Sequence, residues 1–167
     1  VETSEEVHLV CLFPDVKSAL KMHCCISEAL PPLKNRKDIF GEQLILDEND
    51  RVTGEEDQML ITATNLSVYD VFGSAALLGG AVIPAHVDRP SYSMLSNLGM
   101  IPDDLGIKYL EISRNCDKYE FRASRPELDG FGLIRSSDAH YLGDMLERES
   151  LLELGELSPR AVIDMLA

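Results

Sequence analysis

The feature that most constrains the fold is a repeated unit in which a helix-type segment precedes a short apolar run that ends on polar residues. Residues 68–78 predict a helix with Ser67 at its N-cap, and the apolar run 81–85 that follows ends on His86. The same alternation continues through residues 91–136. Alternating helices and buried strands predict an α/β fold with parallel strands, which holds its site at the carboxyl ends of the strands.

The remaining segments predict further elements of the same fold. Residues 7–13 are almost wholly apolar, which is typical of a strand buried on both faces. Asp15 is the predicted N-cap of a helix over residues 16–30. Residues 43–53 predict a small hairpin, and residues 159–166, which begin with a proline, predict a final helix.

Composition narrows the class of protein. With 167 residues, of which 45% are hydrophobic, the chain is long enough for one globular domain. Its apolar passages are shorter than the roughly 20 residues that a membrane helix needs, so we expect no membrane partner. Without a signal peptide in view, we expect a cytoplasmic location. The net charge of −14 disfavours nucleic acid as a partner unless bound cations reverse the local field.

Asp138 and His140 stand two residues apart, directly after the apolar run 132–136. In an extended chain, residues i and i+2 point to the same side, so we expect both side chains to face one metal cluster. The alternative is an ordinary Ser-Asp turn with an exposed histidine.

His86 ends an apolar run and precedes a polar loop that contains Asp88 and Arg89. An imidazole in this place is either a metal ligand or a hydrogen-bonded structural side chain. Arg89 could bind a phosphate through paired hydrogen bonds, or it could form an ordinary salt bridge to Asp88 or another acid.

Glu2 and His8 flank a short polar segment near the first residue. A tight reversal there would place the carboxylate beside the imidazole, whereas the alternative for Glu2 is a solvated side chain. The chain has no dinucleotide-binding glycine motif, P-loop, serine-hydrolase elbow or paired Cys-x-x-Cys. These absences from the sequence count against the corresponding classes of enzyme.

Together these segments resemble the metal motifs of the PHP family, the polymerase and histidinol phosphatase domain family. The resemblance rests on Val-Glu followed by Val-His-Leu-Val-Cys-Leu-Phe, on Gly-Gly-Ala-Val-Ile-Pro-Ala-His, and on Ser-Asp-Ala-His, in that order over nearly the whole chain. Residues 40–93 are similar to a bacterial subgroup of the family.

The resemblance implies an α/β fold, a distorted TIM-like (β/α)7 barrel that binds up to three divalent ions, zinc, manganese or iron, at the carboxyl ends of its strands. It implies that Glu2 bridges two ions, that His8 and His86 bind the second, that Asp138 binds the first, and that His140 binds the third. Bound ions of this kind lower the pKa of a shared water and generate hydroxide that attacks phosphorus.

The family begins with an Asp-x-His-x-His strand that these residues do not contain. The resemblance therefore implies that residues 1–167 are the C-terminal fragment of a single PHP-type domain, with its N-terminal strands missing and residues 33–66 as an insertion or lid. We expect such a fragment to bind metal weakly and to show little hydrolysis by itself.

The leading hypothesis is hydrolysis of a small phosphorylated metabolite or a nucleotide. In that reaction Asp138 and His140 act with the metals, and Arg89 binds the substrate phosphate. The alternatives are a PHP-type binding or regulatory module without turnover, and a nuclease or DNA-repair-associated domain. Nothing in the sequence indicates the oligomeric state.

Overall fold

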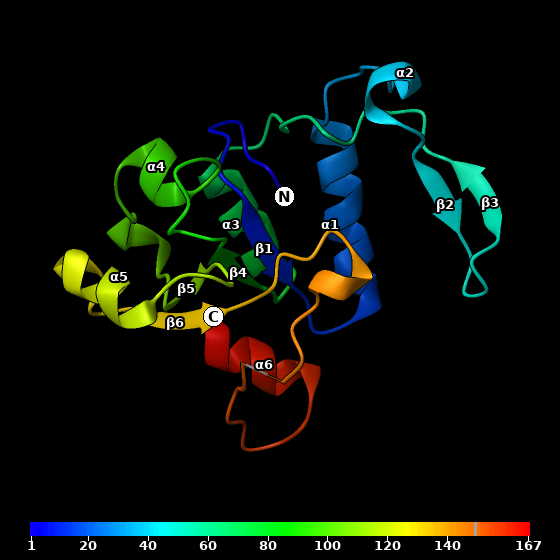
Figure 1. Ribbon diagram of the computed structural model, residues 1–167. Coiled ribbons are helices and arrows are strands. Elements are labelled where there is room, and N and C mark those ends of the chain that lie inside the picture. Colours follow the sequence, from blue (N-terminus) through cyan, green and yellow to red (C-terminus); the bar gives the residue numbers. More distant parts are fainter. Residues whose placement is uncertain (149) are drawn as a thin grey trace.

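A computed structural model describes residues 1–148 and 150–167 (Figure 1). The order of the expected helices and strands is confirmed, and two short helices that the sequence analysis did not predict, α2 and α5, are added. In chain order the elements are β1 (Leu9–Leu12), α1 (Val16–Ala29), α2 (Lys37–Phe40), β2 (Leu44–Leu46), β3 (Val52–Glu55), α3 (Val68–Leu77), β4 (Ala81–Pro84), α4 (Met94–Leu98), η1 (Asp103–Leu105), β5 (Tyr109–Ile112), α5 (Lys118–Ser124), η2 (Pro126–Leu128), β6 (Gly132–Arg135), η3 (Leu142–Asp144) and α6 (Pro159–Leu166).

The predicted N-caps hold their helices as side-chain acceptors. The Asp15 carboxylate accepts a hydrogen bond from the amide of Ser18 at 2.7 Å, which fixes the start of α1. Ser67 and Asp70 form a reciprocal capping box at the start of α3. The hydroxyl of Ser158 accepts a hydrogen bond from the amide of Ala161 at 3.1 Å and caps the start of α6. The helix starts are thus determined locally by the sequence.

The strand directions differ in part from the prediction. β5 and β6 are parallel, with Tyr109 opposite Gly132, but β1 and β4 are antiparallel, with Leu9 opposite Pro84. The prediction of parallel strands is therefore wrong for β1 and β4. A single crossover helix returns the chain to the starting end of the first strand and favours parallel pairing. The segment between β1 and β4 contains helices and a hairpin, and it brings the chain back to the end at which β1 stops, where Leu12 pairs with Ala81. The described ladders join strands in pairs, and the (β/α)7 barrel stays a prediction.

β4 is the centre of the core because all four of its residues are buried. Val82 belongs to a cluster with Val71 of α3 and other buried side chains. Ile83, which points to the opposite face, packs with Ile163 and Leu166 of α6. Helices therefore cover both faces of this strand, and the covered strand delivers His86 from a rigid base.

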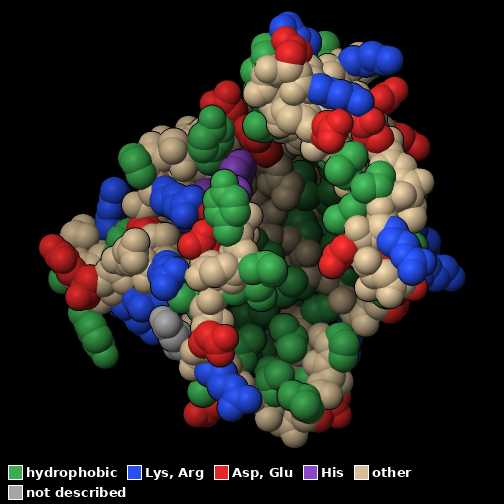
Figure 2. Space-filling view, turned by 45° about the vertical axis from the view of Figure 1, so that its right-hand side comes forward, with side chains coloured by type: hydrophobic (Ala, Val, Ile, Leu, Met, Phe, Trp, Pro, Cys, Tyr) green, Lys and Arg blue, Asp and Glu red, His purple; other side chains and the backbone are tan. Residues whose placement is uncertain are grey.

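Residues 37–61 contain α2, β2 and β3, and we call them the hairpin arm. Together with α1 the hairpin arm forms a more exposed outer region. The arm projects away from the body that contains β1, β4, β5 and β6 (Figure 1). All three residues of β2 are between 45% and 51% exposed. Figure 2 shows a hollowed face on which hydrophobic side chains gather, with a histidine beside its upper part.

In the part of the chain that the structure describes, every helix is too short or too polar to cross a membrane.

Candidate active site

Four of the five predicted metal ligands lie around one cavity of about 420 Å³. Its polar lining consists of Glu2, His8, His86, Glu111, Ser136 and Asp138. The antiparallel pairing explains the meeting of distant segments, because it places the start of β1 beside the end of β4. The amide of Ala85 accordingly donates to the carbonyl of His8 at 3.0 Å.

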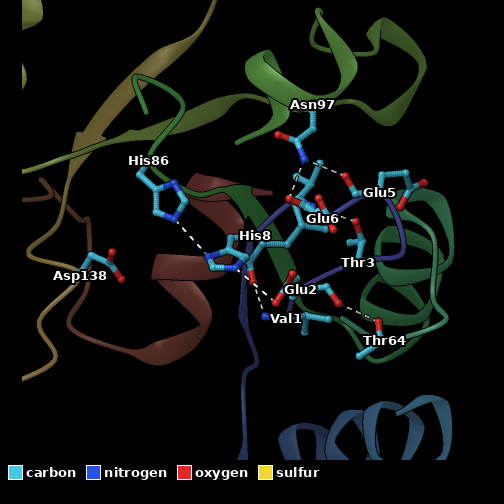
Figure 3. Close-up of polar contacts among 12 residues, drawn as sticks. Val1, Glu2, Thr3, Glu5, Glu6, His8, Thr64, His86, Asn97 and Asp138 are labelled. Atoms are coloured by element: carbon cyan, nitrogen blue, oxygen red, sulfur yellow. Dashed lines mark hydrogen bonds and ion pairs between the residues drawn. The ribbon is translucent and has the colours of Figure 1, made fainter. Parts of the chain in front are cut away.

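The two imidazoles face each other across this junction (Figure 3). His8 Nδ1 lies 3.2 Å from His86 Nε2, and His8 Nε2 lies 3.7 Å from Glu2 Oε2. Glu2 and His8 also form an isolated antiparallel bridge, so of the two alternatives for this segment the structure has the tight reversal. The Tyr92 ring stacks on His8 with a centroid separation of 5.1 Å. The ring of His8 is thus contacted by His86, Glu2 and Tyr92, which fix its orientation.

The backbone is strained at two of the predicted ligands. His86 has a φ of 31° and Asp138 a φ of 47°, both in the left-handed region that favours glycine. Strain of this kind persists where surrounding structure enforces it, and it is concentrated at functional sites. Each of the two side chains lines the cavity from the turn that follows a strand, buried β4 for His86 and partly buried β6 for Asp138.

The electrostatics of His86 favour a neutral ring. Burial is the main cause that lowers the pKa of its imidazole, and the positive charge of Arg89 lowers it further. A neutral imidazole is the form that binds metal. His86 Nδ1 is buried and has no hydrogen-bond partner among residues 1–148 and 150–167. An unpaired buried imidazole nitrogen, on a ring that lines a cavity together with Glu2 and Asp138, fits a cation ligand set.

Arg89 forms a salt bridge in the structure, with Asp138 as the partner. Arg89 Nη1 lies 2.7 Å from Asp138 Oδ2, and both side chains are partly exposed. Asp88 is engaged elsewhere, since one of its carboxylate oxygens accepts from the amide of Ser113 at 2.7 Å. The guanidinium therefore sits beside a cavity-lining carboxylate.

His140 departs from the expected arrangement. Its side chain is 79% exposed, and it is not one of the residues that line the cavity in the described part of the chain. Its Nε2 lies 3.9 Å from Asp138 Oδ1. The prediction assumed an extended chain, but the left-handed φ of Asp138 breaks the alternation that would point both side chains the same way. In this conformation Asp138 and His140 do not both face the cavity.

Sequence reasoning missed Glu111, which lies in β5 and is 5% exposed. Burial raises the pKa of its carboxyl group. The signal was present, because an acid in the middle of the apolar run Tyr-Leu-Glu-Ile requires a polar partner if the strand is buried. Ser136, at the end of the apolar run 132–136, lines the same cavity and is a second residue that the sequence analysis does not predict for the site.

Glu2, His8, His86 and Asp138 are residue types that bind metal ions, but their side chains are not arranged around a common ion position. Among the described residues, no group of three His, Cys, Asp or Glu side chains is arranged to hold an ion. The contacts instead come in pairs, His8 with His86 and Glu2 with His8.

Comparison with known proteins identifies a fold relationship. No family profile and no curated protein sequence matches the chain. Among solved structures, the chain is similar to PfuEndoQ, a lesion-specific endonuclease from Pyrococcus furiosus, with 18% identity and a TM-score of 0.65. The alignment covers 96% of this chain and 36% of that protein, so the chain spans about a third of its length. At this level of identity the likeness shows a shared fold.

Proposed function

We propose that the cavity is part of a phosphoester-hydrolysing site of PHP type that works with divalent cations, zinc, manganese or iron. The observation that carries the proposal is the meeting of Glu2, His8, His86 and Asp138 at one cavity from segments far apart in the sequence. Carboxylates and neutral imidazoles are the donors that such cations take in hydrolases. A bound cation would supply hydroxide near neutral pH and neutralise phosphate oxygens.

The residues of the chain divide the remaining work. His86 presents a neutral nitrogen, since burial and Arg89 disfavour its protonated form. Glu2 restrains the ring of His8 from the side opposite His86. Asp138 contributes negative charge, and Arg89 is partly exposed beside it, where its guanidinium can bind a phosphate oxygen.

We propose further that additional ligands come from outside these 167 residues, in a longer protein whose domain includes the Asp-x-His-x-His strand of the PHP family. Two observations support this. The described side chains contain no group of three arranged to hold an ion, and the chain matches only 36% of the PfuEndoQ chain. On this proposal residues 1–167 by themselves hydrolyse phosphoesters slowly or not at all.

A small phosphorylated metabolite or nucleotide is the substrate class we favour, because a charge of −14 repels a polyanionic backbone. Cleavage of a nucleic acid is the second candidate, and the fold likeness to a lesion-specific endonuclease favours it. Both reactions hydrolyse a phosphoester at the same cavity. Assays on small phosphorylated compounds and on a nucleic acid, compared side by side, therefore separate the two candidates.

The test is Asp138→Asn in a form of the protein extended upstream through the histidine strand. Turnover is expected to fall by about 100-fold or more, while the thermal midpoint changes little, because the substitution removes charge at a cavity and leaves the apolar core intact. The substrates are a chromogenic phosphomonoester, nucleotides and a lesion-containing oligonucleotide, and metal content is measured in parallel.

The matched control is Asp57→Asn, which removes a carboxylate of the hairpin arm that pairs with Lys34. It should leave turnover unchanged. An equal loss of stability and activity in the Asp138 variant would make that residue structural. An extended wild-type protein without metal or hydrolysis would support the regulatory alternative instead.

A further inference from the structure

Glu111 is a buried acid with a defined polar environment. It lies between Leu110 and Ile112, which are both buried, in the middle of β5. Its Oε1 accepts a hydrogen bond from the amide of His86 at 3.3 Å, and its side chain lines the cavity together with Ser136. Among the described residues it forms no ion pair within 4.0 Å. Its contacts are therefore directed at the turn that holds His86.

The main chain of Glu111 holds the same turn. The carbonyl of Glu111 accepts from the amide of Val87 at 2.8 Å. Two successive amides, those of His86 and Val87, thus donate to a single residue of the neighbouring strand, one to its side chain and one to its backbone. This arrangement ties the end of β4 to β5.

The turn needs such a restraint, because His86 has a φ of 31°. A residue with a Cβ atom is disfavoured in the left-handed region, so the surroundings must enforce the conformation. If the backbone of His86 relaxed, its imidazole would leave His8, whose Nδ1 it meets at 3.2 Å.

We propose that Glu111 is a positioning residue that holds the backbone of His86 so that the imidazole faces His8 and the cavity. This role rests on the proposed function only for its catalytic consequence. A purely structural explanation fits less well, because an apolar residue would stabilise a buried strand without the desolvation of a carboxylate. The acid at this position is explained by the amide that it accepts.

The test is hydrogen exchange of single amides in residues 1–167, comparing Glu111→Ala with Glu111→Gln. In Glu111→Ala the His86 amide should lose about tenfold in protection, as expected for one hydrogen bond. The Val87 amide is an internal control, because its acceptor is the backbone carbonyl. Glu111→Gln retains a side-chain oxygen acceptor and should restore protection at His86. Unchanged protection of His86 in Glu111→Ala would overturn the proposal.

The second readout is kinetic and uses the extended protein. Glu111→Ala should lower kcat about tenfold with little change in KM. It displaces the imidazole of His86, a proposed metal ligand, whereas Arg89, the proposed phosphate-binding residue, keeps its salt bridge to Asp138. Glu111→Gln should recover most of the loss. A Gln variant as slow as the Ala variant would contradict a role through hydrogen bonding. Should the Ala variant not fold, Glu111→Leu replaces it, since leucine keeps the bulk without an acceptor. Absence of hydrolysis in the wild type would refute the proposed function, while the exchange experiment would still decide the role of Glu111.

Discussion

β4 and β2 are both short apolar strands, but they differ in burial. All four residues of β4 are buried, whereas all three residues of β2 are exposed. β4 pairs with β1 and packs against α3, α6 and β5, while β2 pairs only with β3 in the described part of the chain. The difference shows that burial depends on the layers that cover a strand.

The same contrast separates two kinds of region in the molecule. At the covered end of β4, strain is tolerated: His86 keeps a left-handed backbone because its amide and that of Val87 donate hydrogen bonds to Glu111 of β5. In the hairpin arm, apolar side chains of β2 lie at the surface without a covering layer (Figure 2). A site that needs fixed geometry is therefore expected on the first region and not on the second.

The largest expected effect tests this contrast with one substitution in two places. Ile83→Ala in β4 removes a side chain that is 1% exposed, so the free energy of unfolding should fall by about 2–4 kcal/mol. Ile45→Ala in β2 removes a side chain that is 49% exposed and should lower it by less than about 1 kcal/mol. Urea unfolding measures both. Equal losses would show that another surface covers the arm and that the contrast is wrong.

The sequence predicted the elements of both regions because their signals are local. Asp15, Ser67 and Ser158 cap the predicted helices, and the apolar runs coincide with β1, β4, β5 and β6. The reversal between Glu2 and His8 was also predictable from a short polar segment between apolar residues. Each of these features depends on a few neighbouring residues.

The features that failed depend on distant residues or on single dihedral angles. The antiparallel pairing of β1 with β4 is set by the path of the whole intervening chain. The displacement of His140 from the cavity follows from one left-handed residue, Asp138, which the pattern of residue types does not reveal. The acid in the apolar run of β5 is visible in the sequence, but its partner, the amide of His86, lies in a distant segment that the pattern does not identify. Such features depend on residues that are neighbours in space but distant in the sequence, or on a single backbone angle.

A smaller effect is expected from Arg89→Ala. This substitution compares the function of an arginine beside the cavity with that of an arginine near the hairpin arm. If Arg89 binds the substrate phosphate in the ground state, KM should rise about tenfold while kcat changes little. Arg36→Ala in the segment that leads into α2 is the matched control, because Arg36 also pairs with an acid, Asp38, at 2.7 Å. The control should leave KM unchanged. Unaltered kinetics in the Arg89 variant would leave that residue with only its salt bridge to Asp138.

The smallest effect is expected where the hairpin arm contacts the end of α1, at Gln58. Its side-chain amide lies 3.4 Å from the carbonyls of Ser27 and Leu30 and 3.5 Å from that of Pro31, at the end of α1. These are long hydrogen bonds, so Gln58→Ala should lower the free energy of unfolding by about 1 kcal/mol or less.

Hydrogen exchange can show where that loss is felt. The amide of Met59, which donates to Leu33 within the base of the arm, should lose protection in Gln58→Ala, whereas the amide of Val87 beside the cavity should not. Gln58→Glu is the control of equal size, and it should behave like the Ala variant because it lacks the donor group and places a negative charge near three carbonyls. If either substitution also exposed the Val87 amide, the arm and the cavity would open together. The two regions would then form one cooperative unit, because only a shared opening transmits a loss at Gln58 to an amide held by β5.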